Sequence, residues 1–232
     1  MNSRTMLRNF TSGFLGNVFI QATLISLSLT AITYALGLGL GWLDGATVSV
    51  PEMFAGVLNY GATFLCIKQR RAYALVGIAG SAAWSYVFFS SNLLASGVVN
   101  AYLAMMLIYG WWRWGKDSNS RRVHHLSPKW VPVYLAVTVA IYLGAVWITS
   151  ALGGSFAFWD AAILVLTILA QLLQDQKVIE VWFVWTAVNV VGVILYWNSG
   201  LYFAMVQQFI FGFANTWGWL DWRKTMKEVT DA

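Results

Sequence analysis

The stretch WFVWTAVNVVGVILYWNSGLYFAMVQQFIFGFANTWGWLDW, residues 182–222, decides the fold. It consists of two apolar runs of helical length, joined by a short polar turn at residues 198–200. Indoles and amides recur in each run at steps of three or four residues, so they share one face of a helix. The first face carries Trp182, Trp185, Asn189, Gly192 and Tyr196, and the second carries Gln208, Phe211, Asn215, Trp219 and Trp222.

These two faces have a structural and a functional interpretation. Polar side chains join helices inside membranes, and tryptophans gather at membrane interfaces, so any one of these residues has an ordinary explanation. An amide or an indole N–H surrounded by hydrocarbon needs a partner, and such groups usually face a bundle interior or a wet cavity. Two faces of the same kind therefore favour a binding surface.

The composition indicates a membrane protein that crosses the bilayer several times. Hydrophobic residues make up 59% of the 232 residues, and charged residues only 10%, whereas a soluble domain has roughly 25% charged residues. Cys66 is the only cysteine, which excludes an intramolecular disulfide, and we expect it to be a packing residue. The net charge of +5 does not indicate a nucleic-acid partner, because the basic residues are spread over short loops.

Eight hydrophobic segments are each close to the roughly 20 residues that span a bilayer. The first is interpreted as a retained helix and not as a signal peptide, because its apolar run is long and lacks a clear A-x-A site. The predicted segments are residues 17–42, 51–68, 72–90, 95–114, 130–150, 156–174, 178–197 and 201–222.

The charges give these segments an orientation. All fourteen lysines and arginines lie at the two termini or in the loops after segments two, four and six. The loops on the other side hold Asp44, Glu52 and Asp160. Positive charge marks the cytoplasmic side, so we expect a multi-pass protein with eight spans and both termini in the cytoplasm.

Segments two to four resemble segments six to eight at an offset of 107 or 108 residues. The run YGWWRW at residues 109–114 aligns with WGWLDW at 217–222, and Asn100 aligns with Gln208. With segment five as the return helix, this predicts an all-α 3+1+3 parallel repeat related by an axis along the membrane normal. The predicted parts are a peripheral transmembrane helix (1–48), a first triple-helix repeat (49–115), a cytoplasmic loop with a linker helix (116–152), a second repeat (153–225) and a cytoplasmic tail (226–232).

The motifs resemble those of the PnuC family of bacterial vitamin transporters over about residues 51–225. They are W-x-x-W-x-x-x-N at 182–189, Y-x-x-x-G-L-Y at 196–202, G-x-x-x-W at 218–222, and YGWWRW at 109–114. The resemblance implies a fold related to SWEET sugar transporters and a homotrimer in the lipid bilayer. It also implies facilitated diffusion of nicotinamide riboside, which a separate cytoplasmic kinase traps by phosphorylation. Relatives transport thiamine, riboflavin or deoxynucleosides, and the extra first helix departs from the seven-helix form.

A flat, cationic and hydroxylated ligand suits the aromatic and amide residues. A tryptophan face attracts a cation, so Trp182 and Trp185 are the candidates for stacking on the pyridinium ring, and Asn189 and Asn215 suit its carboxamide or the ribose hydroxyls. The full set of predicted substrate-binding residues is Trp182, Trp185, Asn189, Gln171, Asn215 and Gln208 from the second repeat, and Asn59, Tyr60, Trp84 and Asn100 from the first.

Other classes of function are less well supported. The sequence lacks a G-x-x-x-x-G-K-[ST] motif, so ATP is not expected to drive transport. We expect no catalytic residue or cofactor. We also expect no metal site, because the adjacent His124 and His125 lack carboxylate or thiol neighbours in the sequence.

Glu180 is expected to pair with Lys177 at the cytoplasmic end of segment seven. A membrane enzyme or a purely structural or signalling bundle are the alternatives from other classes.

Overall fold

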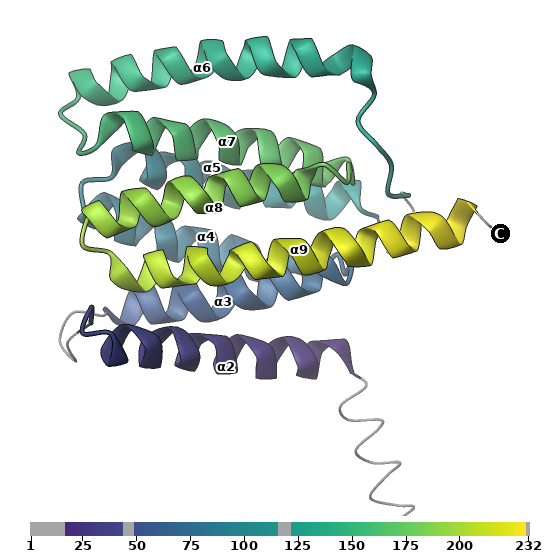
Figure 1. The fold of residues 1–232 in the computed structure, drawn as a ribbon, viewed down its shortest axis with the longest axis horizontal. Helices are drawn as coiled ribbons and strands as arrows, with labels where there is room; N and C mark the ends of the chain where they lie inside the picture. Colours follow the sequence, from purple (N-terminus) through teal and green to yellow (C-terminus); the bar gives the residue numbers. More distant parts are fainter. Residues whose placement is uncertain (1–16, 44–48, 116–121, 231–232) are drawn as a thin grey trace, which may run out of the picture.

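The computed structural model describes residues 17–43, 49–115 and 122–230. This part of the chain is helical, with one short 3-10 helix, η1 (Pro128–Trp130), and no β-strand. The α-helices are α2 (Val18–Gly39), α3 (Val50–Ile67), α4 (Tyr73–Ser90), α5 (Leu94–Arg113), α6 (Val131–Ala151), α7 (Ala157–Asp175), α8 (Val181–Asn198) and α9 (Tyr202–Thr230) (Figure 1).

The all-helical prediction is confirmed. Seven of these helices, α2 to α8, are long and apolar enough to cross a membrane. The eighth predicted span lies in α9, which does not reach the same hydropathy over its described length. Gln207, Gln208 and Asn215 lie in its apolar half, and charged residues occupy its C-terminal end. These polar groups lower the mean hydropathy of α9, yet the helix runs beside α8 and α3 in the bundle (Figure 1).

Local sequence signals explain where the helices begin and end. At the start of α3, the Ser49 side chain accepts from the Glu52 backbone N–H, and the Glu52 carboxylate accepts from the Ser49 backbone N–H, which forms a capping box. The turns after α3, α4 and α8 each contain a residue with positive φ, respectively Gln69, Asn92 and Gly200. Such a residue ends a helix and reverses the chain within a few residues.

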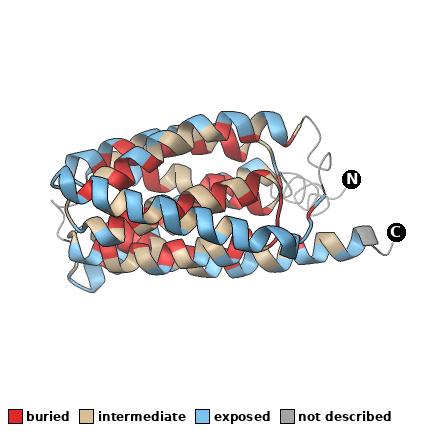
Figure 2. Cartoon of the chain, turned by 90° about the horizontal axis from the view of Figure 1, so that it is seen from above, coloured by how far each residue is buried: buried red, intermediate tan, exposed pale blue. Residues whose placement is uncertain are grey.

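Six helices form a closed ring. The helices α3, α4 and α5 pack in sequence, and so do α7, α8 and α9. The two groups meet where α5 packs on α7 and where α3 packs on α9. The remaining two lie outside the ring, α2 against α3 and α9, and α6 against α7 and α5. Figure 2 shows buried positions on the inner sides of the bundle and exposed positions on its outer surface.

The basic residues gather at one end of the bundle. The turns after α3, α5 and α7 and the charged end of α9 lie on the same side (Figure 1). Every lysine and arginine among the described residues lies in or next to one of these segments, namely Lys68, Arg70, Arg71, Arg113, Arg122, Lys129, Lys177, Arg223, Lys224 and Lys227. The other predicted basic residues, Arg4, Arg8, Lys116 and Arg121, lie outside the described residues, as does Asp44.

The first helix is attached to the ring by more than apolar packing. The face of α2 toward the bundle carries small residues, and from it the Thr33 hydroxyl makes a 2.6 Å hydrogen bond with the Tyr60 hydroxyl of α3. Tyr60 is 2% exposed. Its side chain is therefore engaged with α2, and the expectation that it lines the ligand cavity is wrong, because sequence spacing alone could not tell which side of α3 faced another helix.

We expect Tyr60→Phe to lower the free energy of unfolding by about 1 kcal/mol, because the Thr33 hydroxyl loses a partner that hydrocarbon cannot replace. Thermal unfolding of the purified protein in detergent would measure this change. Ligand affinity should stay within twofold of wild type, and a tenfold loss of affinity with unchanged stability would contradict the structural role of Tyr60.

Candidate functional site

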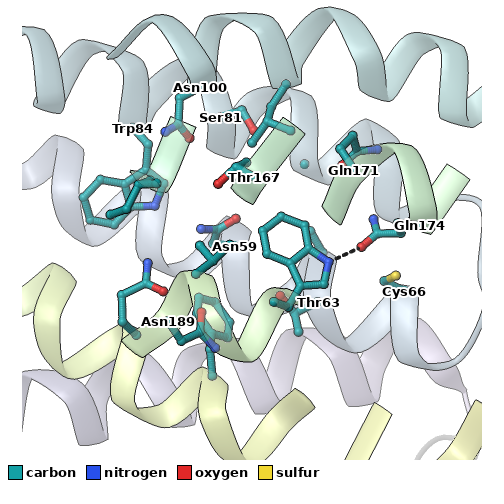
Figure 3. Close-up of a pocket in the computed structure, with 18 of the residues that line it drawn as sticks. Asn59, Thr63, Cys66, Ser81, Trp84, Asn100, Thr167, Gln171, Gln174 and Asn189 are labelled. Atoms are coloured by element: carbon teal, nitrogen blue, oxygen red, sulfur yellow. Dashed lines mark hydrogen bonds between the residues drawn. The ribbon is translucent and has the colours of Figure 1, made fainter. Parts of the chain in front are cut away.

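A cavity lies inside the ring of six helices (Figure 3). All six contribute to its wall, whereas α2 and α6 do not. The lining residues are Asn59, Ala62, Thr63, Cys66, Tyr73, Gly77, Ser81, Trp84, Phe88, Asn100, Leu103, Leu107, Ile163, Thr167, Gln171, Gln174, Trp182, Trp185, Val188, Asn189, Tyr196, Ala204, Gln208, Phe211 and Asn215.

Apart from Tyr60, every residue predicted from the sequence to bind a substrate lines this cavity. The structure brings together Trp182, Trp185, Asn189, Gln171, Asn215, Gln208, Asn59, Trp84 and Asn100. The two helix faces of the opening stretch, residues 182–222, divide along their length. The first face lines the cavity at every position except Gly192, whereas the second lines it only up to Asn215, so that Trp219 and Trp222 do not contribute.

A chain of amides runs along the wall formed by α8 and α9. The neighbours of the Asn189 amide fix its orientation, because only one orientation satisfies donors and acceptors together. Its nitrogen then donates to Gln208 Oε1 at 2.7 Å, and its oxygen accepts from Asn215 Nδ2 at 2.8 Å. The Asn215 nitrogen also lies 3.3 Å from Thr186 Oγ1. The network holds these side chains in place, so the wall is pre-organised.

Gly192 allows two of these helices to approach each other. A Cβ at this position would lie 2.9 Å from Cγ of Gln208, which is closer than real contacts of this kind. The absence of a side chain on α8 therefore makes room for the Gln208 side chain at the end of the amide chain.

Trp185 is held by its edge. Its Nε1 donates to Gln174 Oε1 at 2.8 Å (Figure 3). One turn earlier on α7, Gln171 donates to the carboxylate of Asp175 at 2.8 Å, and the Tyr73 hydroxyl donates to the same oxygen at 3.3 Å. The hydrogen bond to Gln174 fixes the edge of the Trp185 indole, whereas its ring faces make no contact with another aromatic ring among the described residues.

Other polar groups of the cavity have no partner. The side chains of Asn59, Thr63, Ser81 and Thr167 line the cavity and make no hydrogen bond within the part of the chain that the structure describes. They lie around the middle of the cavity in Figure 3. Free donors and acceptors of this kind suit a ligand with several hydroxyl groups.

Aromatic clusters lie at the two ends of the cavity. At the end far from the basic residues, Phe88 stacks between Trp84 and Tyr196, with ring centroids 5.1 Å and 5.2 Å away. Near the basic end, Trp222 packs against Trp182 and Trp114, with centroids 5.2 Å and 6.2 Å away. Both clusters are largely buried, so the cavity is covered by aromatic side chains at each end.

The comparisons with known proteins agree with this geometry. A family model described as "Nicotinamide mononucleotide transporter" matches residues 49–224. The chain belongs to the nicotinamide mononucleotide transporter family. The resemblance to PnuC proteins that the motifs indicated is thereby confirmed, and the matched residues contain every residue that lines the cavity but not α2.

Relatives within the nicotinamide mononucleotide transporter family carry two kinds of name. The chain is 25% identical over 231 residues to the nicotinamide riboside transporter PnuC of Escherichia coli (strain K12), covering 87% of this chain and 95% of that protein. It is 28% identical over 141 residues to the riboflavin/roseoflavin transporter RibM of Streptomyces davaonensis, covering 58% and 66%. A solved structure titled "Crystal structure of the Vitamin B3 transporter PnuC" shares the fold, with a TM-score of 0.72 at 16% identity over 89% of this chain and 92% of that one.

Several residues of the cavity were missed by sequence reasoning, although the sequence contained a signal for them. Extending the repeat alignment at an offset of 108 residues pairs Thr63 with Gln171 and Ser81 with Asn189, and both members of each pair line the cavity. The same alignment pairs Cys66 with Gln174. Cys66 was expected to serve packing alone, yet it lines the cavity (Figure 3).

The predicted pair between Lys177 and Glu180 is wrong. Lys177 is fully buried, and its Nζ donates to Gln69 Oε1 at 3.1 Å. Glu180 instead accepts from the Leu126 backbone N–H at 2.9 Å and lies 2.8 Å from Nδ1 of His125. Lys177 has positive φ and ends its helix, so the two residues do not lie on a common helical face.

The contacts of Glu180 fasten the loop after α5 to the turn before α8. Partial burial raises the pKa of the Glu180 carboxyl, but the hydrogen bonds from His125 and from the Leu126 backbone outweigh it, so the pKa lies below its ordinary value. A carboxyl group with a lowered pKa stabilises the folded state above its ordinary pKa and loses that contribution as the pH falls through the lowered value.

We expect Glu180→Gln to lower the melting temperature by a few degrees at pH 7, since the partly exposed carboxylate accepts hydrogen bonds that contribute about 1 kcal/mol. The difference from wild type should shrink as the pH falls through the lowered pKa of Glu180, where the wild-type carboxyl becomes protonated. Melting curves from pH 3 to pH 8 would measure it. The exposed Glu228→Gln is the matched control, and an equal effect of both variants would contradict the role of Glu180.

Proposed function

We propose that this protein takes up nicotinamide riboside across the bacterial inner membrane by facilitated diffusion. The observation that carries this function is the cavity, because every residue that lines it is uncharged and two kinds of group dominate, aromatic rings and amides. The E. coli relative, and a Haemophilus influenzae relative that is 23% identical over 79% of this chain and 85% of its own length, are named nicotinamide riboside transporters.

In this proposal the pyridinium ring stacks on Trp185. The indole is held at its edge by Gln174 at 2.8 Å and offers its face. The attraction between a cation and a tryptophan face contributes about 0.5–2 kcal/mol, with the higher value in a dry site. Trp182 provides further aromatic surface, and Asn189 and Asn215 recognise the carboxamide from the amide chain.

A phosphorylated ligand fits this cavity less well than the riboside. Proteins bind phosphate with arginine, lysine or helix N-termini, and no arginine, lysine or histidine lines the cavity within the described residues. The uncharged wall favours a ligand with a single positive charge over the mononucleotide that gives the family its name.

We further propose that the helix ring consists of two repeats, residues 49–115 and 153–225, with 116–152 as the connecting loop and linker helix. The bounds of α4 and α8 differ by 108 residues at both ends, and so do the first residues of α5 and α9. Residues with positive φ occur in the turns of both units at the same spacing, Gln69 with Lys177 and Asn92 with Gly200. Contacts are also exchanged in a symmetric way, since the last helix of each unit packs on the first helix of the other.

The cavity supports the same two-fold arrangement. Residues 108 apart line it in pairs, as expected for a site on the axis that relates two repeats. The pairs are Asn59 and Thr167, Thr63 and Gln171, Cys66 and Gln174, Gly77 and Trp185, Ser81 and Asn189, Phe88 and Tyr196, Asn100 and Gln208, Leu103 and Phe211, and Leu107 and Asn215.

Two repeats around a central site suit alternating access, in which the halves rock about the bound ligand. The aromatic clusters at the two ends of the cavity would then open in turn. The sequence has no nucleotide-binding motif of the P-loop kind, which supports a passive process. Both termini are placed in the cytoplasm on the basis of the basic residues, with residues 1–48 as a peripheral helix and 226–232 as a tail.

The assembly and the metabolic partner follow from the resemblance to PnuC proteins. The protein is proposed to form a homotrimer in the bilayer, and a cytoplasmic riboside kinase is proposed to trap the imported compound as a charged phosphate ester. Light scattering on the purified protein would test the first proposal, and uptake in cells with and without a riboside kinase would test the second.

The deciding experiment is transport by the pure protein in vesicles. Radiolabelled nicotinamide riboside should equilibrate across the bilayer without ATP or an ion gradient, and fluorescence titration should give micromolar binding, which corresponds to about −8 kcal/mol. Thiamine and riboflavin are the competing ligands, the second because of the RibM relative. Vesicles that equilibrate thiamine or riboflavin but not nicotinamide riboside would reassign the substrate.

We expect Trp185→Ala and Asn189→Leu each to weaken binding of nicotinamide riboside at least tenfold, because the first removes the stacking face and the second interrupts the amide chain. Fluorescence titration or calorimetry would measure the affinities. Two residues of the same helix provide matched controls, since Trp197→Ala and Asn198→Leu change exposed side chains outside the cavity. Unchanged affinity in both cavity variants would remove these residues from the site.

Nicotinic acid riboside should bind at least tenfold more weakly than nicotinamide riboside. Its carboxylate would lie against amide oxygens that already accept hydrogen bonds, and the described residues that line the cavity include no cation to compensate its charge. Competition between the two compounds in the titration would measure the ratio, and equal affinities would contradict the amide assignment.

A further inference from the structure

Three tryptophans line the cavity, and they present different parts of their indoles to it. The N–H of Trp185 is already hydrogen-bonded, because it donates to Gln174 at 2.8 Å, and no aromatic ring among the described residues packs on its ring faces. Trp84 has the reverse arrangement. Its ring stacks on Phe88 with a centroid distance of 5.1 Å and an interplanar angle of 16°, while its Nε1 has no hydrogen-bond partner.

The surroundings of Trp84 fix its orientation. Phe88 lies between its ring and that of Tyr196, which stacks on the other face of the phenyl group at 5.2 Å and 12°. Trp84 is 3% exposed, so its N–H has little access to bulk water. Figure 3 shows the indole nitrogen on the side of the ring that faces the cavity, toward Thr167 and Asn59.

A buried indole N–H can only donate, so without an acceptor it loses the hydrogen bond that it would make in water. The neighbouring cavity residues Asn59, Thr167 and Ser81 likewise make no hydrogen bond within the described residues. The indole nitrogen of Trp84 therefore faces unused polar groups in the middle of the cavity, whereas Trp185 provides a fixed aromatic surface. The two parts of the cavity suit the two halves of a nucleoside-like compound, which has a flat ring and a hydroxylated sugar.

We infer that Trp84 recognises the sugar of the ligand. Its Nε1–H donates a hydrogen bond to a hydroxyl oxygen of the ribose, while Trp185 stacks on the pyridinium ring. The inference rests on the proposed function and adds a direction to it, with the sugar toward the aromatic cluster of Trp84, Phe88 and Tyr196. Trp84 thus acts as a specificity-determining residue that favours ribosides over sugar-free pyridinium compounds, and Phe88 positions it.

Trp182 is the rival for this role, since its Nε1 is also buried and has no partner. Its six-membered ring occupies the space left by Gly218, where a Cβ would lie 2.5 Å from the ring atoms, and its edge packs against Trp222 at 83°. Trp182 thereby belongs to the aromatic cluster at the basic end of the cavity, away from the free polar groups around Trp84.

The test compares two ligands on purified full-length protein, nicotinamide riboside and 1-methylnicotinamide, which has the same charged ring and carboxamide but no sugar. Trp84→Phe keeps an aromatic ring to stack on Phe88 and removes the donor together with the pyrrole part of the indole, as the control Trp222→Phe also does. We expect it to weaken riboside binding about tenfold, the loss of one hydrogen bond to a buried donor, and to leave the affinity for 1-methylnicotinamide within twofold. Trp84→Tyr, which returns a donor to the edge of the ring, should recover part of the loss.

The matched control is Trp222→Phe, because Trp222 also has a buried N–H without a partner but does not line the cavity. It should leave the ratio of the two affinities unchanged, and so should Trp182→Phe. The inference is overturned if Trp84→Phe weakens both ligands equally, if it changes neither, or if Trp182→Phe alone abolishes the preference for the riboside. Wild-type protein that binds no nicotinamide riboside would overturn the proposed function itself, a result distinct from these.

If Trp84→Phe does not fold, deoxy analogues of nicotinamide riboside can test the inference on the wild-type protein. In wild-type protein, removal of one particular ribose hydroxyl should cost about tenfold in affinity, and the other hydroxyls should cost less. Phe88→Leu, which loosens the stack that orients Trp84, should reduce that preference. Equal affinity for every deoxy analogue would overturn the inference.

Discussion

Polar groups that lie within hydrocarbon must find their partners inside the protein, and this constraint governs the bundle. The lipid core offers no hydrogen bonds, so each amide on a membrane helix has to face another polar group or a cavity. On α8 and α9 the solution is the chain from Gln208 through Asn189 to Asn215. The same chain fixes the wall of the cavity, so the requirement that keeps the helices together also pre-organises the site.

In the proposed two-repeat arrangement, the two halves of the ring carry different side chains at corresponding positions. Gly77, Ser81 and Thr63 in the first half lie 108 residues before Trp185, Asn189 and Gln171 in the second. At these positions the second half has large aromatic and amide side chains, whereas the first half has small side chains that leave space for a ligand. A site of this kind suits an asymmetric ligand, and the difference explains why the W-x-x-W-x-x-x-N motif at residues 182–189 has no counterpart in the first half.

Much of the fold was predictable because a bilayer simplifies the problem. Helix length, hydropathy and the separation of basic residues gave the helices within a few residues, and the faces at Trp182–Tyr196 and Gln208–Asn215 pointed to the cavity. Contacts that depend on packing were out of reach. The side of α3 that carries Tyr60 could not be assigned without knowing that α2 lies there. The partner of Glu180 could not be predicted either, because His125 lies 55 residues away along the chain. Lys177 was misjudged because its left-handed backbone interrupts the helical spacing.

The polar contact between α2 and α3 also bears on how the chain assembles during synthesis. Thr33 meets Tyr60 as soon as the second of these helices enters the bilayer, so an early helical hairpin has an internal hydrogen bond. The next group at that junction, Gln207 of α9, donates to the Gly56 carbonyl at 3.1 Å but is translated some 150 residues later. The junction between α3 and α9 can consequently close only after α9 has been synthesised.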